Sequence, residues 1–280
     1  MKPTLRVIDK KATQTLGTAE YLWIEEDGQL RHKTRSILVT ADSGGDPLPI
    51  IEWWTTTAGR EGGATPISGP LQLLLPAHYV PNPLRPNGYV VLCEVRDLKD
   101  RVVPWNTRAP LRDLEATVTA PLGVWLGLEV ALSDGMPLQA LEEHMAVCLD
   151  AGLFLHSYTA MCGSYKLGPR GSLGDVDFDP PSPLIVCDHY WIARYFLKAL
   201  AGKYDAPVGT ACVRRWFLST KASRENTKIA KDNARKLGSH TPDEGTRIAA
   251  PDRGYTVTDG IADRDSFDPY KVTYDLVSNL

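Results

Sequence analysis

The pattern of apolar residues changes near residue 104, and this change limits the possible folds more than any other feature of the sequence. Before it, short runs of β-branched and aromatic residues alternate with turn residues. Two such runs flank the turn Glu26–Gly28 and predict a hairpin, and a third follows the Asn-Gly pair at 87–88. The Gly-rich stretch 55–70 is typical of a long exposed loop. The first hundred residues are therefore expected to be β-rich.

After a proline-containing connection, helical and strand patterns alternate. Apolar residues at helical spacing predict helices over 137–152, with Gly152 at the C-terminal cap, and over 188–203, with Asp188 as N-cap. The run "VWLGLEVALS" predicts a buried strand, and 153–169 predicts two strands around a turn. The polar stretch 221–237 predicts a solvated helix, and a last short helix is expected to start at Asp268-Pro269. Together the two halves predict an α+β fold.

Composition favours no particular kind of partner, and the cysteine spacing argues against a disulfide framework and a structural zinc site. With 31 basic and 34 acidic residues the net charge is -3, so nothing favours nucleic acid or an anionic membrane, and we expect neither as a partner. The N-terminus lacks the apolar core of a signal peptide, and no run of about 18 apolar residues follows, which predicts a cytoplasmic protein. The five scattered cysteines contain no C-x-x-C pair and are expected to be buried free thiols.

Common nucleotide-binding, zinc-protease and hydrolase signatures are missing from the sequence. Several plainer segments nevertheless occur in a recognisable order. They are "AEYLWIEEDGQLRHKTRSI", "VWLGLEVAL", "EEHMAVCLDAGL", "YKLGP", "CDHYWIARYFLKAL", "LSTKASREN" and "DPYKVTYDLV". In this order the segments resemble type II glutamine synthetase. The resemblance implies a small N-terminal β-grasp-type domain over 1–103 and a C-terminal catalytic-type domain over 104–280, with an antiparallel sheet and helices. It also implies a homo-oligomer in which the N-terminal domain closes the neighbour's pocket.

That family uses ATP and two divalent cations, which six side chains hold. Its E-x-E strand supplies one ligand to each metal, and here that strand has Glu129 and Ala131. Counted back from Gly168-Pro169, Ser157 and Ser164 occupy the places of two further carboxylates. Hydroxyls are weak ligands for a dication. At the family's histidine stands Arg214 or Arg215, a guanidinium that repels metal, and at the sixth ligand stands Val257 or Thr258. We therefore expect neither metal nor nucleotide as cofactor.

The residues around the former metal site are candidates for a different task. Glu129 is either a general acid or base among apolar neighbours or a relic satisfied by an arginine. Arg214 and Arg215 are candidate clamps for a carboxylate, and either can also pair with Glu129 or face solvent. Other candidates for lining a substrate pocket are Ser157, Tyr158, Cys162 and Ser164. Cys162 is a possible nucleophile, although most such cysteines are only buried, and His156 is more often packed than catalytic.

Three functional hypotheses follow from these losses. The first is a repurposed enzyme that performs metal- and ATP-independent chemistry on an amino-acid-like or amide-containing molecule. The second is a non-catalytic binding or regulatory pseudoenzyme. The third, a residual ATP-dependent carboxylate-amine ligase, is opposed by the ligand count. Two further features have ordinary interpretations that we favour: hairpin packing for Trp53-Trp54, and a solvated strand edge for Arg31–Arg35.

Overall fold

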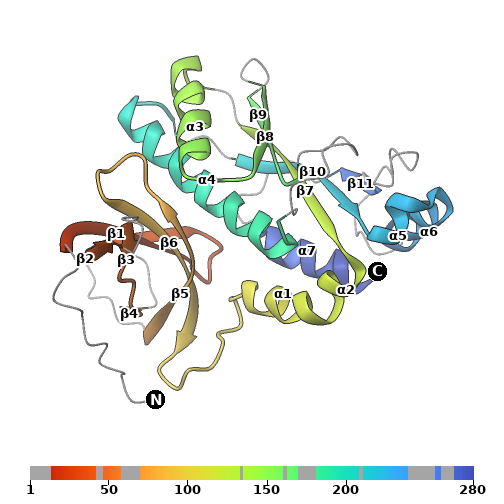
Figure 1. Cartoon of the computed structure of the whole chain (residues 1–280), viewed down its shortest axis with the longest axis horizontal. Coiled ribbons are helices and arrows are strands. Elements are labelled where there is room, and N and C mark those ends of the chain that lie inside the picture. Colours follow the sequence, from red (N-terminus) through yellow and green to blue (C-terminus); the bar gives the residue numbers. More distant parts are fainter. Residues whose placement is uncertain are drawn as a thin grey trace.

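The computed structural model forms two β-sheets, with helices gathered mainly around the second (Figure 1). The fold is thus mixed α/β, as the sequence predicted. The structure describes residues 14–41, 47–57, 70–132, 135–159, 163–169, 181–207, 211–238, 256–259 and 268–280.

The first sheet has the strand order β3-β2-β1-β6-β5-β4. The predicted hairpin is confirmed, because β1 and β2 pair antiparallel around Gly28, whose φ of 73° suits glycine. Strand β6 is the predicted run after Asn-Gly, and it pairs parallel to β1. Of the predicted loop 55–70, residues 55–57 belong to β4 and 58–69 lie outside the described residues. The strands are β1 (Gln14–Ile24), β2 (Leu30–Ala41), β3 (Pro47–Pro49), β4 (Trp54–Thr57), β5 (Leu71–Pro81) and β6 (Gly88–Asp97).

The two faces of the first sheet belong to different cores. Alternation along β1 sends Leu22 to the core shared with the second half of the chain, and Tyr21 to a smaller core on the other face. Trp54 closes that smaller core: its ring lies edge-on to Tyr21, with centroids 5.4 Å apart, and Lys33 Nζ lies 3.7 Å from its centroid. Packing is thus what Trp54 does, while Trp53 beside it is 59% exposed.

The second sheet is antiparallel throughout, with the order β11-β10-β7-β9-β8. The run "VWLGLEVALS" and both strands predicted within 153–169 are confirmed. The strands are β7 (Trp125–Leu132), β8 (Leu155–Thr159), β9 (Ser164–Leu167), β10 (Ala211–Ser219) and β11 (Thr256–Asp259).

The predicted helices are present, but the stretch 221–237 and the start of the helix at Asp188 differ from the prediction. The solvated stretch 221–237 forms two helices instead of one, because Asn226 between them has an extended backbone. Gly152 has a φ of 76° just after α3, as expected of a helix-ending glycine. The helices are α1 (Arg108–Leu114), the π-helical turn η1 (Glu115–Thr119), α2 (Ala120–Leu122), α3 (Leu138–Asp150), α4 (Pro183–Lys203), α5 (Lys221–Glu225), α6 (Thr227–Gly238) and α7 (Pro269–Ser278).

The prediction that Asp188 caps a helix was wrong. Helix α4 begins five residues earlier, where Ser182 Oγ accepts a hydrogen bond from the Ile185 N–H and Pro183 occupies the first turn. Asp188 is therefore inside the helix, and it is fully buried. His189 follows it and accepts a hydrogen bond from the Phe154 N–H at its Nδ1, a structural role as expected.

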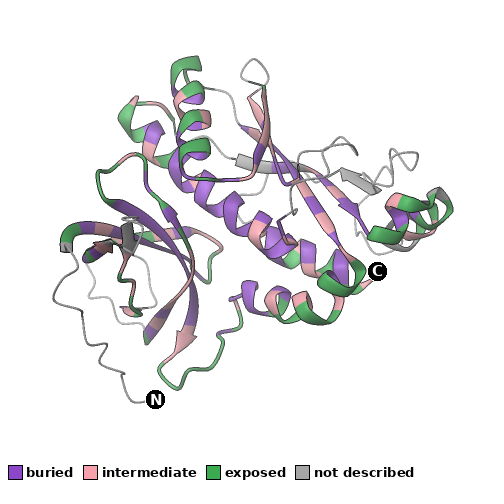
Figure 2. Cartoon of the chain, in the orientation of Figure 1, coloured by how far each residue is buried: buried purple, intermediate pink, exposed green. Residues whose placement is uncertain are grey.

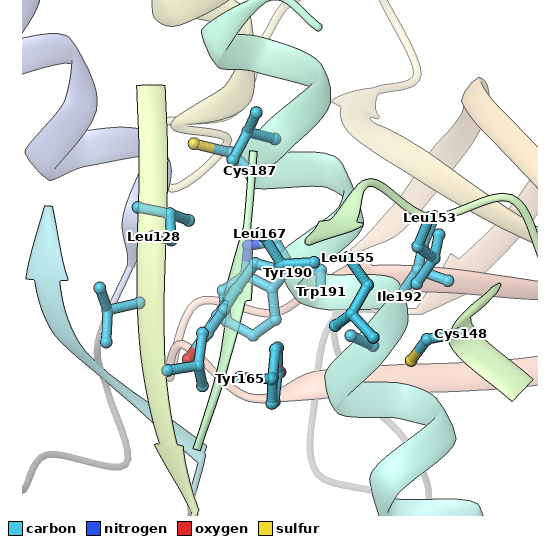
Figure 3. Packing of buried hydrophobic residues seen from close by; sticks show 14 of the residues in the cluster. Leu128, Cys148, Leu153, Leu155, Tyr165, Leu167, Cys187, Tyr190, Trp191 and Ile192 are labelled. Carbon is cyan, nitrogen blue, oxygen red and sulfur yellow. The ribbon is translucent and has the colours of Figure 1, made fainter. Parts of the chain in front are cut away.

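Helix α4 is the centre of the main core. It runs between the two sheets in Figure 1, and most of its length is buried in Figure 2. Figure 3 shows Tyr190 and Trp191 of α4 among leucines of the second sheet. Although α4 is the longest helix, no helix among the described residues is long and apolar enough to cross a membrane. The cysteines whose side chains are described are buried free thiols, as predicted: Cys93, Cys148 and Cys187.

Four buried polar residues join the two halves of the molecule, and we call them the Arg108 cluster: Glu94 of β6, Arg108 of α1, Asp188 of α4 and Tyr270 of α7. The Arg108 guanidinium donates to both Asp188 oxygens at 2.9 and 2.8 Å and to Glu94 Oε1 at 2.8 Å. Tyr270 donates to Asp188 Oδ1 at 2.6 Å. Because these bonds link β6 to three helices, the cluster fixes the first sheet against the second half of the chain.

Candidate functional site

Strand β7 divides its side chains between the core and a second, more open face. Leu126, Leu128 and Val130 are fully buried on the side of α4. Period-two alternation places Gly127, Glu129 and Ala131 on the opposite face. A single carboxylate thus projects from the middle of the central strand, away from the core.

Glu129 lies between two cations on the neighbouring strands. The register pairs it with Lys166 of β9 on one side and with Arg215 of β10 on the other. Lys166 Nζ is 3.7 Å and Arg215 Nη1 is 3.5 Å from Glu129 Oε2. We call Lys166, Glu129 and Arg215 the charged row. The sequence left open whether Arg214 or Arg215 pairs with Glu129, and the register shows that Arg215 is opposite Glu129.

The environment of Glu129 is incomplete despite these two ion pairs. Its side chain is only 10% exposed, yet Oε2 accepts no hydrogen bond. Both cations are more open, with side-chain exposures of 37% for Lys166 and 41% for Arg215. Long, partly solvated ion pairs of this kind contribute about 0–1 kcal/mol each. A nearly buried carboxylate oxygen without a hydrogen bond is unusual and calls for an explanation.

The two serines predicted from the motif lie on this same face. Ser157 of β8 is opposite Lys166, and Ser164 of β9 is opposite Ala131. An irregularity in β8 between Leu155 and Ser157 makes this possible, because it shifts the alternation by one residue. The sheet thus brings together Glu129, Arg215, Ser157 and Ser164 from four strands.

The same irregularity sends Tyr158 to the core side, away from Glu129. Its ring stacks on Tyr165 with centroids 6.1 Å apart, and burial raises the pKa of its hydroxyl. Cys162 lies outside the described residues, and so does the side chain of Arg214. The structure therefore does not bring Tyr158 into the candidate site.

Two residues on the open face, and the register position of a third residue, were missed from the sequence. Lys166 is two residues after Ser164, so strand alternation alone could have placed it on the same face. Phe217 is two residues after Arg215 and lies opposite Gly127, 5.4 Å from Lys166 Nζ at its ring centroid. The backbone register also places Asp259 of β11 opposite Arg215. No motif pointed to any of them.

The donor set on this face is poor in metal ligands. Among the described residues no three His, Cys, Asp or Glu side chains gather closely enough to hold a metal ion. Ala131 offers no donor, the two serines offer neutral hydroxyls, and Arg215 brings a positive charge to the carboxylate.

The structure is thus a mixed α/β protein with a curled antiparallel sheet. On one face of this sheet, the Glu129 carboxylate lies between the cationic side chains of Lys166 and Arg215. Comparison with known proteins makes the class specific: the chain is a distant relative of the glutamine synthetases. It is 29% identical over 266 residues to glutamine synthetase of Streptomyces viridochromogenes, covering 79% of this chain and 73% of that protein. It is 29% identical over 231 residues to the enzyme of Frankia alni, covering 69% and 59%. It is 26% identical over 234 residues to glutamine synthetase of Rhizobium meliloti, and the match covers 69% of this chain and 64% of that protein.

These relatives confirm the resemblance drawn from the motifs. No family model matches the chain. The chain also spans only part of its relatives, 73% of the first and about six tenths of several others. What the longer proteins do is therefore not carried over to this chain as a whole.

Proposed function

We propose that this chain is a glutamine synthetase-like protein that has lost the two-metal, ATP-dependent ligase site and binds a small amino-acid-like molecule at the charged row. The observation that supports this most is the position of Arg215, 3.5 Å from the carboxylate that a metal would need. In a relative that worked with two dications, this carboxylate would face metal, not a guanidinium.

Electrostatics favours an anionic ligand over a dication here. Lys166 and Arg215 are both positively charged and are more exposed than Glu129, with side-chain exposures of 37% and 41% against 10%. A divalent cation would have to displace the Lys166 and Arg215 side chains from Glu129, and it would find no second carboxylate at Ala131. A ligand carboxylate instead meets two donors, one of them a guanidinium able to bind it with two parallel hydrogen bonds.

The proposed architecture follows the family resemblance. The first sheet is contained within residues 14–97 and has the parallel β1–β6 pair, which supports a β-grasp-type domain over 1–103. The second sheet and α3–α7 lie after Trp125, in accord with a catalytic-type domain over 104–280. The exposed pair Leu16 and Leu38, which face each other in register, supports a homo-oligomer.

Glu129 decides between the enzymatic and the purely binding form of this proposal. Its Oε2 is shielded from water, accepts no hydrogen bond and lies close to Lys166 and Arg215, so a ligand N–H or O–H reaches it only when those two side chains turn toward the ligand. In the enzymatic form Glu129 exchanges a proton with that group as general acid or base. In the alternative form the same contact only holds the ligand, and the protein is a binding or regulatory pseudoenzyme.

Isothermal titration of the full chain tests the binding proposal. We expect L-glutamate or another amino acid to bind in the micromolar to millimolar range, Arg215→Ala and Lys166→Ala to weaken it at least tenfold, and Mg-ATP not to bind. The matched control is Lys203→Ala, which removes an exposed cation of α4 that pairs with Glu143 of α3 and not with Glu129. Micromolar binding of Mg-ATP would instead support the ligase and contradict the proposal.

Turnover separates the enzyme from the pseudoenzyme. A mixture of amino acids and their amides is incubated with the wild type and with Glu129→Gln, and the products are followed by mass spectrometry. Product formation that disappears in Glu129→Gln supports the repurposed enzyme. Ligand binding without turnover in either protein supports the pseudoenzyme.

A further inference from the structure

Helix α4 meets the first sheet through two histidines whose rings lie against each other. His189 of α4 is 3% exposed, and its ring centroid is 5.3 Å from that of His78 on β5. We propose that this pair is an acid-sensitive contact: protonation loosens β5 from α4 and releases the segment before β8, while the rest of the chain stays folded. The proposal does not depend on a ligand at the charged row.

The hydrogen bond of His189 requires a neutral ring. Its Nδ1 accepts from the Phe154 N–H, with 3.0 Å between the two nitrogens. A backbone N–H only donates, so Nδ1 is unprotonated and the proton of the neutral ring is at Nε2. The Phe154 ring also stacks on the His189 ring, with centroids 5.1 Å apart. A proton at Nδ1 would end this hydrogen bond and set two N–H donors against each other.

His78 makes protonation of the pair more costly. Its Nε2 is shielded from water and has no hydrogen-bond partner among the described residues, so no described group accepts from a proton bound there. Burial lowers the pKa of both rings, and His78 lowers that of His189 further, to about 3. Because two imidazolium rings at this distance repel each other, the closed contact is stable with neutral rings.

Charged groups near the pair do not compensate for its burial. Asp188 of α4 raises the pKa of His78, but burial has the larger effect, and Arg108 of α1 lowers this pKa as well. Both Asp188 oxygens already accept from Arg108. The guanidinium stays charged throughout the acid range, so it continues to join α1 to α4 when the histidine pair opens.

The remaining titratable groups at this junction are either bonded within the Arg108 cluster or lie further along α4. Glu94 of β6 accepts from Arg108, and Tyr270 of α7 donates to Asp188. His32 of β2 is exposed, and its ring lies 5.5 Å from that of Tyr195. The acid response of the contact therefore depends mainly on His78 and His189.

Phe154 connects the histidine pair to the second sheet. Its carbonyl oxygen accepts from the Gly168 N–H at 2.9 Å, and it stands one residue before β8. When His189 no longer accepts the Phe154 N–H, the start of β8 loses a hydrogen bond that holds it to α4. Ser157, the β8 residue on the open face, follows Phe154 by three positions, so acid loosens that side of the candidate site.

Hydrogen exchange of the Phe154 amide in the full chain tests the proposal. Because the pKa of His189 is lowered in the closed form, the contact is complete above about pH 6.5 and weakens as the pH falls toward 3. We expect the opening constant of Phe154, corrected for intrinsic exchange, to rise about 30-fold between about pH 7.5 and pH 5. The Val130 amide in the middle of β7 reports global unfolding and should stay more protected at both pH values.

Three glutamine variants separate titration from bonding. In His189→Gln the side-chain oxygen can accept the Phe154 N–H but binds no proton, so the rise should be less than about threefold. His78→Gln removes the second imidazole and should reduce the rise in part. The matched control is His144→Gln, which removes another buried titratable ring, on α3, and should leave the rise at Phe154 unchanged.

Nitrogen NMR of the wild-type imidazoles gives a measurement that does not depend on the folding of any variant. At neutral pH it should show His189 neutral, with its proton at Nε2. A proton at Nδ1 would overturn the proposal, and so would an opening constant of Phe154 that changes less than about threefold between these pH values. An equal rise at Val130 would also overturn it, because acid would then unfold the whole chain.

Discussion

The Arg108 cluster and the charged row are two groups of charged side chains that differ in burial and in hydrogen bonding. In the cluster, Arg108 and Asp188 are almost completely buried and are joined by two hydrogen bonds of 2.8 and 2.9 Å. In the row, Arg215 and Glu129 are 3.5 Å apart, and the Glu129 oxygen accepts no hydrogen bond. Both groups have an arginine facing a carboxylate, but only the first is geometrically complete.

This difference separates a structural role from a functional one. A buried ion pair is tolerated when hydrogen bonds satisfy its charges, and the Arg108 cluster meets this condition across four elements. In the row, Glu129 Oε2 accepts no hydrogen bond and its two ion pairs are long, so these contacts contribute little to folding and the retention of Glu129 calls for another explanation. Binding of a ligand at the row is such an explanation.

The largest expected effect is at Arg108. Arg108→Met removes the charge and the donors but keeps much of the side-chain volume, and it leaves the buried Asp188 without its only cationic partner among the described residues and Glu94 without one of its three arginines. We expect the free energy of unfolding in urea to fall by about 3–5 kcal/mol. Substitution at Arg215 should cost less than about 1 kcal/mol.

Arg112→Ala is the matched control for Arg108. Arg112 also donates to Glu94, at 2.6 Å, but its side chain is 36% exposed. Because water can replace part of its contacts, we expect a clearly smaller loss than for Arg108→Met. Equal losses for Arg108→Met and Arg215→Met would remove the distinction between cluster and row.

A second prediction concerns His144, a titratable side chain that is buried without an ion pair to a carboxylate among the described residues. His144 is fully buried on α3, where Nε2 is 2.9 Å from the Ala193 carbonyl oxygen, and burial lowers its pKa to about 4 from the ordinary 6.5. The unfolded chain therefore binds a proton at a higher pH than the folded one. Its contribution to stability is complete above pH 6.5 and is lost as the pH falls toward 4, by about 3 kcal/mol in total.

His144→Gln checks this pH dependence. The amide can still donate to Ala193 but does not titrate, so urea unfolding between pH 7 and 4 should lose about 3 kcal/mol less than in the wild type. His189, with a pKa lowered to about 3 chiefly by burial, accounts for a remaining slope. An unchanged slope in His144→Gln would contradict the assignment.

Strand alternation explains why part of the site could be predicted. The period of two placed Glu129 and Ala131 on one face of β7, and the motif spacing placed Ser157 and Ser164 near them. Tyr158 could not be placed, because the shift in alternation after Leu155 arises from pairing with β9 and not from local sequence. The same holds for the fold: most strands and helices follow local patterns, whereas register depends on distant residues.

Asp188 shows the same limit for charges. An aspartate before a helical pattern is a good cap candidate, but Ser182-Pro183 is a stronger start signal five residues earlier. The partner that makes a buried Asp188 tolerable is Arg108, 80 residues away in sequence. Sequence patterns report the local preference, and here the distant partner decides the outcome.

The smallest expected effect is the coupling within the row. A double-mutant cycle with Arg215→Met, Glu129→Gln and both together should give an interaction free energy of about 0.2–1 kcal/mol in urea unfolding. This value should fall further at 1 M salt, because Arg215 is 41% exposed and screening reaches it. The matched cycle at Arg108 and Asp188 should give several kcal/mol with little salt dependence, because both side chains are shielded from solvent. A row coupling as large as that of the cluster would mean that Glu129 is retained for folding and not for binding a ligand at the row.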